Sequence, residues 1–253
     1  MLGQIRTHLD QALPEALRPA AFADKFLSRS LATDRILSGP FRGMRYIRKS
    51  LGSVLLPKLL GTYEIELAPA LQSYLSDKPQ VFVNVGTAEG YFAAGLAWRC
   101  PGAKVIAFEA DKAGHRMITR LADLNGLLDR IEIRGFCSQQ ELIGVLRNCC
   151  PTLVIVDIEG GEAELLSSEV SKMLERSDLI VEIHPWIVSD IEAILTGRFR
   201  STHRINIIHA RGRRARDLPF GPIVNHVLGR WLVPKLNELR PEPMRWLHLV
   251  AKR

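Results

Sequence analysis

The stretch from Val81 to Tyr91 constrains the fold of this 253-residue chain more than any other. Residues 81–85 form a β-branched and aromatic run, which stops at the segment 86–90 before a small and apolar stretch with helical spacing begins. Gly86 and Gly90 permit a tight turn, and they let a ligand lie against the backbone because neither residue has a Cβ. The pattern predicts a strand, a glycine turn and a helix.

A carboxylate follows the next apolar run along the chain. Residues 105–108 end at Glu109, about twenty residues beyond the glycine turn, where doubly wound sheets hold the two hydroxyls of a ribose. This placement predicts a nucleoside ligand. The glycines are spaced G-x-x-x-G, whereas a dinucleotide fingerprint needs three in G-x-G-x-x-G order. The wider turn leaves room for an amino-acid moiety, and it resembles motif I of the class I S-adenosylmethionine-dependent methyltransferases. Asn84 stands where that family usually has an acid.

Further strands and helices alternate through the chain. Short apolar runs predict strands at residues 81–85, 105–108, 131–133, 153–156, 179–183, 205–208 and 246–250. Helices between strands imply a parallel sheet with helices on both faces and with function at the carboxyl ends of the strands. We therefore expect an α/β fold: a Rossmann-like, doubly wound, mostly parallel seven-stranded sheet of the class I methyltransferase type, whose last strand is antiparallel.

Apolar stripes and proline breaks suggest how the remaining segments are organised. Residues 1–39 are expected to form two helical pieces, so residues 1–56 are assigned to an N-terminal helical extension with a basic segment, and residues 57–253 to the methyltransferase domain. A helix over residues 65–75 is expected to be capped by Thr62, and another is expected over residues 162–175.

Three carboxylates crowd the end of the fourth predicted strand. Glu159 and Glu162 lie where a following helix would offer its N-terminal dipole, so capping explains them without a ligand. Asp157 lies at the tip of the strand, beside the predicted cofactor. Three roles remain open for Asp157: it can attract the sulfonium, orient a substrate hydroxyl, or join a metal site of hard oxygen ligands.

His184 follows the fifth predicted strand at the same edge of the sheet. An imidazole with an unperturbed pKa is neutral at physiological pH and can take a hydroxyl proton, so His184 is the candidate general base. A structural histidine before a proline is the alternative. Glu182, two residues earlier on the same side of the strand, is a candidate to orient the imidazole.

Taken together, these motifs resemble the FkbM family of methyltransferases. The matching runs are residues 84–91, 108–111, 157–162 and 182–184, and the similarity extends from about Pro57 to Pro185. The resemblance implies O-methylation of a sugar, glycan or polyketide-like hydroxyl, with S-adenosylmethionine as the donor. Whether a divalent metal ion is also required is left open by the sequence.

Candidate site residues follow from the motifs and from this resemblance. Phe136, at the end of the third strand, is a candidate to contact the adenine ring, although it is equally well explained as core. Asp157 and His184 are the candidate catalytic residues. The candidate cofactor-binding residues are Asn84, Gly86, Thr87, Gly90, Glu109, Ala110, Phe136, Cys137 and Asp157.

The formal net charge of +7 points to an anionic partner. Residues 198–216 contain many arginines, which can bind an anionic glycan or small-molecule acceptor. The alternative is that they form a solvent-exposed charged surface without a ligand. Phe199 is the only aromatic residue among them, so nucleic acid is the less favoured partner. An RNA methyltransferase, or a binding protein that keeps the fold without turnover, are the competing functions.

The remaining composition fits an ordinary globular enzyme. No apolar run reaches the roughly eighteen residues of a membrane span, and the N-terminus lacks the pattern of a signal peptide, so a cytoplasmic protein is expected. Four cysteines show no metal-site spacing and are expected to be reduced structural thiols.

Overall fold

The computed structural model describes residues 33–78, 80–236, 238 and 244–252, which belong to two compact units. One unit contains the chain up to Ile65 together with Arg211–Pro241, and the other contains Glu66–Ala210 and Glu242–Arg253. The division at residues 56 and 57 stays a prediction, and in the structure the described part of Arg211–Pro241 groups with the N-terminal part. Of residues 1–39, where two helical pieces are predicted, residues 1–32 lie outside the described residues, and residues 33–39 are not helical.

The first unit contains short helices around a small leucine core. Its elements are α3 (Leu55–Leu60), η4 (Ala215–Asp217), α11 (Pro222–Leu232) and η5 (Val233–Leu236). Pro222 opens α11, a position where its missing N–H has no helical partner to lose. Leu56 and Leu60 of α3 share a buried cluster with Leu232 of α11.

The second unit contains all seven strands. In chain order its elements are η2 (Ile65–Leu67, shared with the first unit), α4 (Ala68–Gln72), β1 (Gln80–Val85), α5 (Tyr91–Arg99), β2 (Ala103–Phe108), α6 (Lys112–Leu124), η3 (Leu128–Arg130), β3 (Ile131–Arg134), α7 (Gln139–Asn148), β4 (Leu153–Val156), α8 (Glu162–Leu165), α9 (Ser168–Met173), β5 (Asp178–Ile183), α10 (Ile191–Phe199), β6 (His203–His209) and β7 (Arg245–Ala251). Every predicted strand is present.

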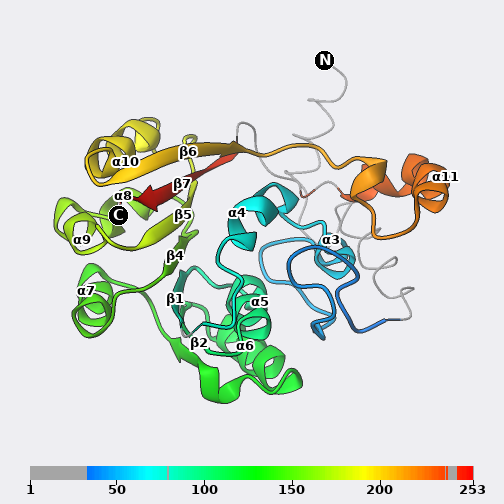
Figure 1. Cartoon of the computed structure of the whole chain (residues 1–253), viewed down its shortest axis with the longest axis horizontal. Coiled ribbons are helices and arrows are strands. Elements are labelled where there is room, and N and C mark those ends of the chain that lie inside the picture. Colours follow the sequence, from blue (N-terminus) through cyan, green and yellow to red (C-terminus); the bar gives the residue numbers. More distant parts are fainter. Residues whose placement is uncertain (1–32, 79, 237, 239–243, 253) are drawn as a thin grey trace. The chain divides into compact units, whose positions relative to one another are not determined.

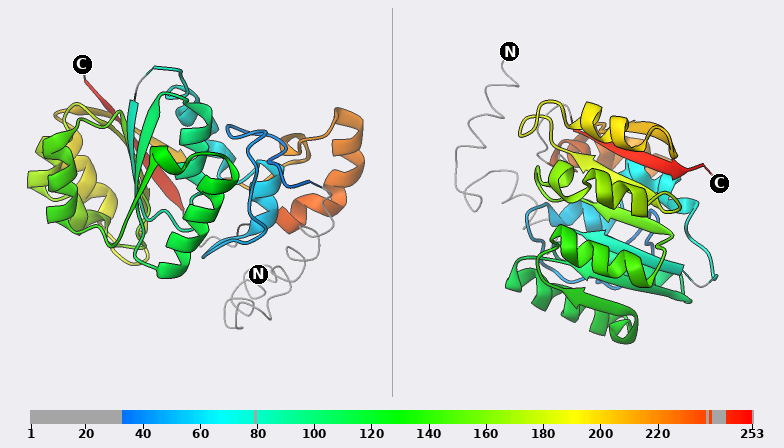
Figure 2. Two further views of the ribbon diagram at one scale, coloured as in Figure 1. Left: turned by 90° about the horizontal axis from the view of Figure 1, so that it is seen from below. Right: turned by 90° about the vertical axis from the view of Figure 1, so that its left-hand side faces the viewer.

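The strands form one sheet in the order β3-β2-β1-β4-β5-β7-β6. β7 is antiparallel to both of its neighbours, whereas β1 to β5 pair in parallel. Helices α5 and α6 cover one face of the sheet, and α7 to α10 cover the other (Figures 1 and 2). The predicted doubly wound, mostly parallel sheet with an antiparallel last strand is confirmed.

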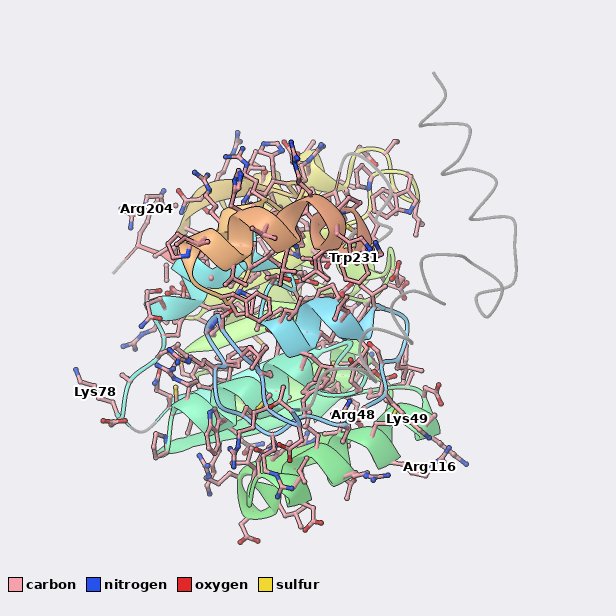
Figure 3. All side chains as sticks on the ribbon, turned by 90° about the vertical axis from the view of Figure 1, so that its right-hand side faces the viewer. Arg48, Lys49, Lys78, Arg116, Arg204 and Trp231 are labelled. Carbon is pink, nitrogen blue, oxygen red and sulfur yellow. The ribbon has the colours of Figure 1, made fainter. Side chains whose placement is uncertain are left out.

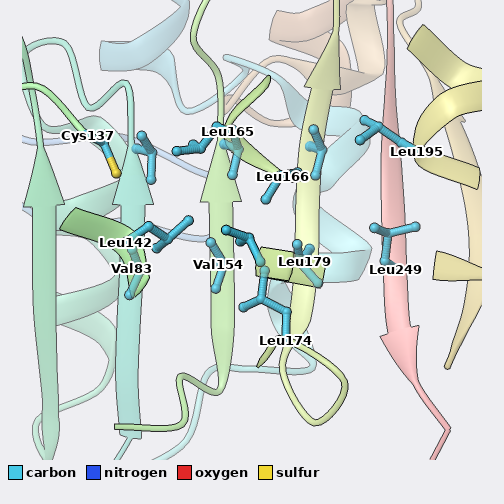
Figure 4. Close-up of a cluster of buried hydrophobic side chains, with 14 of the residues drawn as sticks. Val83, Cys137, Leu142, Val154, Leu165, Leu166, Leu174, Leu179, Leu195 and Leu249 are labelled. Carbon is cyan, nitrogen blue, oxygen red and sulfur yellow. The ribbon is translucent and has the colours of Figure 1, made fainter. Parts of the chain in front are cut away.

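Alternation along the strands divides the side chains between these two faces. Val83, Val154, Leu179 and Leu249 belong to one buried cluster with side chains from α7 to α10 (Figure 4). The intervening strand residues point to the face that carries α5 and α6. This division decides which polar side chains meet at the carboxyl edge of the sheet.

Two predicted helices are broken in the structure. Residues 65–72 form a 3₁₀ turn and the short α4, which has a proline in its first turn. The Thr62 hydroxyl bonds to the Pro57 carbonyl oxygen (3.4 Å), so it closes α3 and does not cap a following helix. The predicted helix over residues 162–175 is divided into α8 and α9, because the Ser167 side chain caps a new start by accepting from the Val170 N–H.

Two further expectations bear on the described residues. None of their helices combines the length and the apolar character that crossing a membrane requires. All four cysteines are free, and burial raises the pKa of the Cys137 thiol to about 12, which keeps it protonated.

A buried hydrogen-bond network connects Tyr74, which follows α4, to strands β5 and β7. The Tyr74 hydroxyl donates to Asp178 Oδ2 (3.0 Å) and lies 2.9 Å from His248 Nε2. Asp178 Oδ1 accepts the Ala251 N–H (2.9 Å), so this carboxylate joins β5 to β7.

We expect Tyr74→Phe to lower the free energy of unfolding by about 1–3 kcal/mol, because it removes a donor to a buried carboxylate. Ser73→Ala is the matched control, since it deletes an exposed hydroxyl whose bond goes to Ala70 in the same turn. Urea unfolding of both variants measures the difference, and equal losses would show that the network contributes nothing.

Candidate functional site

Strand register gathers polar side chains at one corner of the sheet. Val85, Val156 and Val181 lie side by side on β1, β4 and β5, and all three face the apolar cluster. The next residue on each strand therefore faces the opposite side. These residues are Gly86, Asp157 and Glu182, and His184 lies two residues beyond Glu182.

The glycine turn brings the ends of β1 and β4 into contact. Gly86 has a φ of +77°, and a Cβ built on it would lie 1.6 Å from the Asp157 carbonyl oxygen. Gly90, the N-cap of α5, has a φ of +98°. No side chain fits at Gly86, because the backbone of Asp157 occupies the space that a Cβ would take. The close approach of a ligand to this turn stays a prediction.

Hydrogen bonds lock this turn onto β2. The N–H groups of Gly86 and Thr87 both donate to the Phe108 carbonyl oxygen, and the buried Thr87 hydroxyl lies 3.0 Å from the Asn84 carbonyl oxygen. Glu109 Oε2 accepts the Ala88 N–H (2.6 Å), and Oε1 accepts the Asp111 N–H (2.8 Å). Glu109 is partly exposed, and each carboxylate oxygen retains a second lone pair for a ligand hydroxyl.

Gly114 of α6 packs against this turn, and the sequence prediction missed it. A Cβ at this position would lie 2.5 Å from Glu109 Cγ and 2.9 Å from the Ala88 carbonyl oxygen. Only glycine lets α6 pack this closely against the carboxylate and the turn. No local pattern marked this glycine, because the conflict is with groups on other elements.

Asn84 is buried on the same face as the polar corner. Its Oδ1 has no hydrogen-bond partner among the residues that the structure describes. A buried acceptor that lacks a donor is costly, so this side chain suits a ligand that donates to it.

The other candidate cofactor residues occupy different environments. Ala110 is exposed, and the Phe136 side chain is 74% exposed, so its ring is available for contact and is not core. The Cys137 side chain is buried in the apolar cluster. Only its backbone is therefore able to contact a ligand. Their roles toward a cofactor stay predictions.

The His184 imidazole is fixed by Glu162. His184 Nδ1 lies 2.8 Å from Glu162 Oε1, and both side chains have no exposed surface. The same Oε1 accepts the Gly160 N–H (3.1 Å), so the turn after β4 holds the carboxylate that holds the imidazole. Glu162 thus does more than favour a helix N-terminus. Glu162, and not Glu182 as expected, orients the ring through a hydrogen bond.

The other ring nitrogen faces three more carboxylates. His184 Nε2 lies 3.3 Å from Glu159 Oε2, 3.7 Å from Asp157 Oδ1 and 3.9 Å from Glu182 Oε1. Glu159 is held in this position by a backbone φ of +52°, which is uncommon for a residue with a side chain. Such strained positions are concentrated at functional sites.

The charges of this corner shift two pKa values. Burial lowers the pKa of His184, but the hydrogen bond and charge of Glu162, with the charges of Glu182 and Glu159, outweigh it, so the pKa is raised. Burial raises the pKa of Glu162, but the bonds from His184 and the backbone bring it below its usual range. The premise of an imidazole with an ordinary pKa is therefore wrong, because the surrounding acids favour its protonated form.

Trp246 is a further residue at this corner that the sequence prediction missed. It lies opposite Glu182 in the register of β5 and β7, and its indole Nε1–H donates to Glu182 Oε2 (3.1 Å). The bond fixes Glu182 with Oε1 toward His184. Pairing of strands so distant in sequence is set by the fold and left no local signal.

Several solved structures resemble this chain in three dimensions despite low sequence identity. A precorrin-6Y C5,15-methyltransferase from Geobacter metallireducens superposes with a TM-score of 0.52 at 10% identity, covering 75% of this chain and 88% of that one. A human methyltransferase 10 domain containing protein gives 0.52 at 13% identity, with 91% and 99% covered. An rRNA methylase from Streptococcus thermophilus gives 0.50 at 14% identity, with 74% and 97% covered.

The fold is that of the class I methyltransferases. No family model matches the sequence, and no curated protein matches it. At identities of 10–14%, these structures establish the fold alone.

We expect Gly114→Ala to lower the free energy of unfolding by about 1–3 kcal/mol, because the added methyl group overpacks the contact with Glu109. Gly144→Ala in α7 is the matched control. It brings the same gain of up to about 1 kcal/mol in helix propensity, and no atom lies within 4 Å of its Cβ. Thermal unfolding compares the two, and a stabilised Gly114→Ala variant would contradict the close packing.

Proposed function

We propose that this protein is an S-adenosylmethionine-dependent methyltransferase that acts on a hydroxyl group of a sugar, glycan or polyketide-like molecule. The observation that carries the proposal is the Glu109 carboxylate. It lies at the carboxyl end of β2, and it is bonded to the turn between β1 and α5 in a sheet with methyltransferase strand order. Ligands of doubly wound sheets bind at this edge.

The residues around the turn fit the proposed donor. Glu109 would hold the ribose hydroxyls, and the exposed Phe136 ring would contact the adenine. Gly86 and Gly90 would let the amino-acid part approach the backbone, and Asn84 Oδ1 would accept a hydrogen bond from it, where the family usually has an acid. Ala110 and the backbone of Cys137 complete the proposed contacts. The donor supplies a methyl group on a positively charged sulfur.

Asp157 would hold the acceptor. Its side chain is 36% exposed at the tip of β4, next to Gly86 and to the buried His184. A carboxylate here accepts a hydrogen bond from a hydroxyl group and aligns its oxygen for attack. His184 as the proton acceptor stays a prediction, and it requires an imidazole that has first lost its proton.

The arginine-rich segment provides limited support for an anionic acceptor. Arg198 donates to the carbonyl oxygens of Ala163 and Leu166, Arg211 pairs with Asp217, and Arg213 pairs with Glu238. These bonds are structural. The exposed members include Arg204, whose side chain extends away from the sheet (Figure 3).

The resemblance to the FkbM family supports the hydroxyl acceptor. The turn after β4 presents acids, in residues 157–162, and lacks an amide-proline-aromatic run of the kind used to methylate base amino groups. The competing function is a binding protein that keeps the fold without turnover. Transfer of a labelled methyl group to any acceptor in a screen of sugars, glycans and polyketides would exclude it.

We expect Glu109→Ala to weaken binding of S-adenosylhomocysteine about 10- to 100-fold, because a hydrogen bond to a charged group contributes roughly 1.5–3 kcal/mol. Isothermal titration calorimetry measures the change. Glu132→Ala is the control, since it removes an exposed acid from the neighbouring strand β3. Equal affinity of wild type and Glu109→Ala would refute the ribose assignment.

A further inference from the structure

Asp157, Glu182 and His184 bring one ligand atom each to a single point. The two carboxylate oxygens and the imidazole nitrogen all lie within 4.8 Å of one another, and His184 Nε2 is 3.7 Å from Asp157 Oδ1 and 3.9 Å from Glu182 Oε1. Two atoms bound to one ion at about 2.1 Å are separated by about 3.0–4.2 Å, depending on their angle. Both distances from His184 Nε2 fall in this range, and the 4.8 Å limit for the group is close to it, so a small adjustment allows joint coordination.

A buried nitrogen without a hydrogen-bond partner points into this group. The His184 side chain has no exposed surface, and its Nε2 has no partner among the described residues. Glu162 engages Nδ1, and a proton on Nδ1 leaves the Nε2 lone pair directed at the carboxylate oxygens. Facing acceptors repel one another unless a positive charge lies between them.

Both buried side chains of the group are held by partners outside it. Glu162 fixes the imidazole, and the Trp246 indole fixes Glu182 by bonding to Oε2, which leaves Oε1 toward His184. Metal ligands in proteins usually show this arrangement, with a carboxylate on the far nitrogen of the histidine. It preserves the orientation that coordination requires.

We propose that Asp157, Glu182 and His184 bind one divalent cation. The donor set of one imidazole nitrogen and two carboxylate oxygens suits Mn²⁺ or Zn²⁺ better than Mg²⁺ or Ca²⁺, which prefer oxygen ligands throughout. Asp157 is 36% exposed and Glu159 79% exposed, so the group opens to solvent on that side. Three protein ligands with an open side are typical of catalytic metal sites.

The cation would serve the acceptor hydroxyl, and this part of the inference rests on the proposed function. A hydroxyl oxygen at the open side would be polarised, which favours loss of its proton. His184 is then a ligand and not the general base, because its Nε2 lone pair is engaged. The exposed Glu159 carboxylate, which lies 3.3 Å from His184 Nε2, would then take the proton.

Manganese binding to the 253-residue chain tests the site without cofactor or acceptor. After treatment with EDTA and removal of the chelator, Mn²⁺ is titrated and the free ion is counted by electron paramagnetic resonance. We expect one ion per chain, with electron spin echo modulation from the ¹⁴N of an imidazole. Lack of stoichiometric binding, or binding without the nitrogen modulation, would overturn the site, and the cluster would then be only an ion-pair network around a protonated histidine.

Two variants remove one ligand each, and one keeps all three. Asp157→Asn changes a partly exposed side chain, so we expect it to fold as wild type does and to lose at least tenfold in Mn²⁺ affinity. Glu182→Gln should do the same. Glu164→Gln is the control, because it removes one negative charge from an exposed position on α8, next to the site. If Asp157→Asn, Glu182→Gln and Glu164→Gln all bind Mn²⁺ with the same affinity, the loss of one negative charge explains the result and the ligand assignment is refuted.

The readouts separate this inference from the proposed function. Glu109→Ala should bind Mn²⁺ as wild type does, and Asp157→Asn should retain the fold by circular dichroism. Manganese binding without S-adenosylhomocysteine binding would refute the proposed function and keep the metal site. The reverse result would refute the metal site and keep the function.

Discussion

The close approach of β1 and β4 at their carboxyl ends is the constraint on which the candidate site depends. With a Cβ at Gly86 only 1.6 Å from the Asp157 carbonyl oxygen, any side chain there would force the two strand ends apart. The contact fixes Asp157 beside the glycine turn. The same turn is bonded to β2 through Phe108 and Glu109, so three strand ends are placed by one short segment. A ligand held at the turn is therefore held next to the acids.

The second constraint is the crowding of carboxylates around His184, at the end of β5, which is next to β4 in the sheet. Four carboxylates approach one imidazole that has no exposed surface. Burying like charges together is costly, and folds retain such arrangements where the charge is used. The hydrogen bonds from Trp246 and from the Gly160 N–H hold Glu182 and Glu162 despite their mutual repulsion. These bonds fix the cluster of acids at the carboxyl edge of the sheet, the edge at which doubly wound sheets bind their ligands.

The sheet and its strand ends were predictable from the sequence because each depends on local patterns. Apolar runs located all seven strands, and glycine spacing located the turn. The roles within the corner were not predictable, because they depend on which strands are neighbours. Glu182 meets Trp246 only after β7 pairs with β5, and Glu162 reaches His184 only when the turn after β4 folds back. Gly114 shows no local need for glycine, since the conflict is with a side chain on another element.

The two constraints also explain why Asp157 has the most open role of the corner. Its backbone is fixed by Gly86 and its side chain retains 36% exposure, whereas the side chains of Glu162, Glu182 and His184 are almost entirely buried and held by bonds. Asp157 and Glu159 are the carboxylates of the corner that reach solvent. In our proposals the acceptor is therefore contacted by Asp157, or by the ion that Asp157 shares with Glu182 and His184. The buried residues then set the charge and the position of that contact.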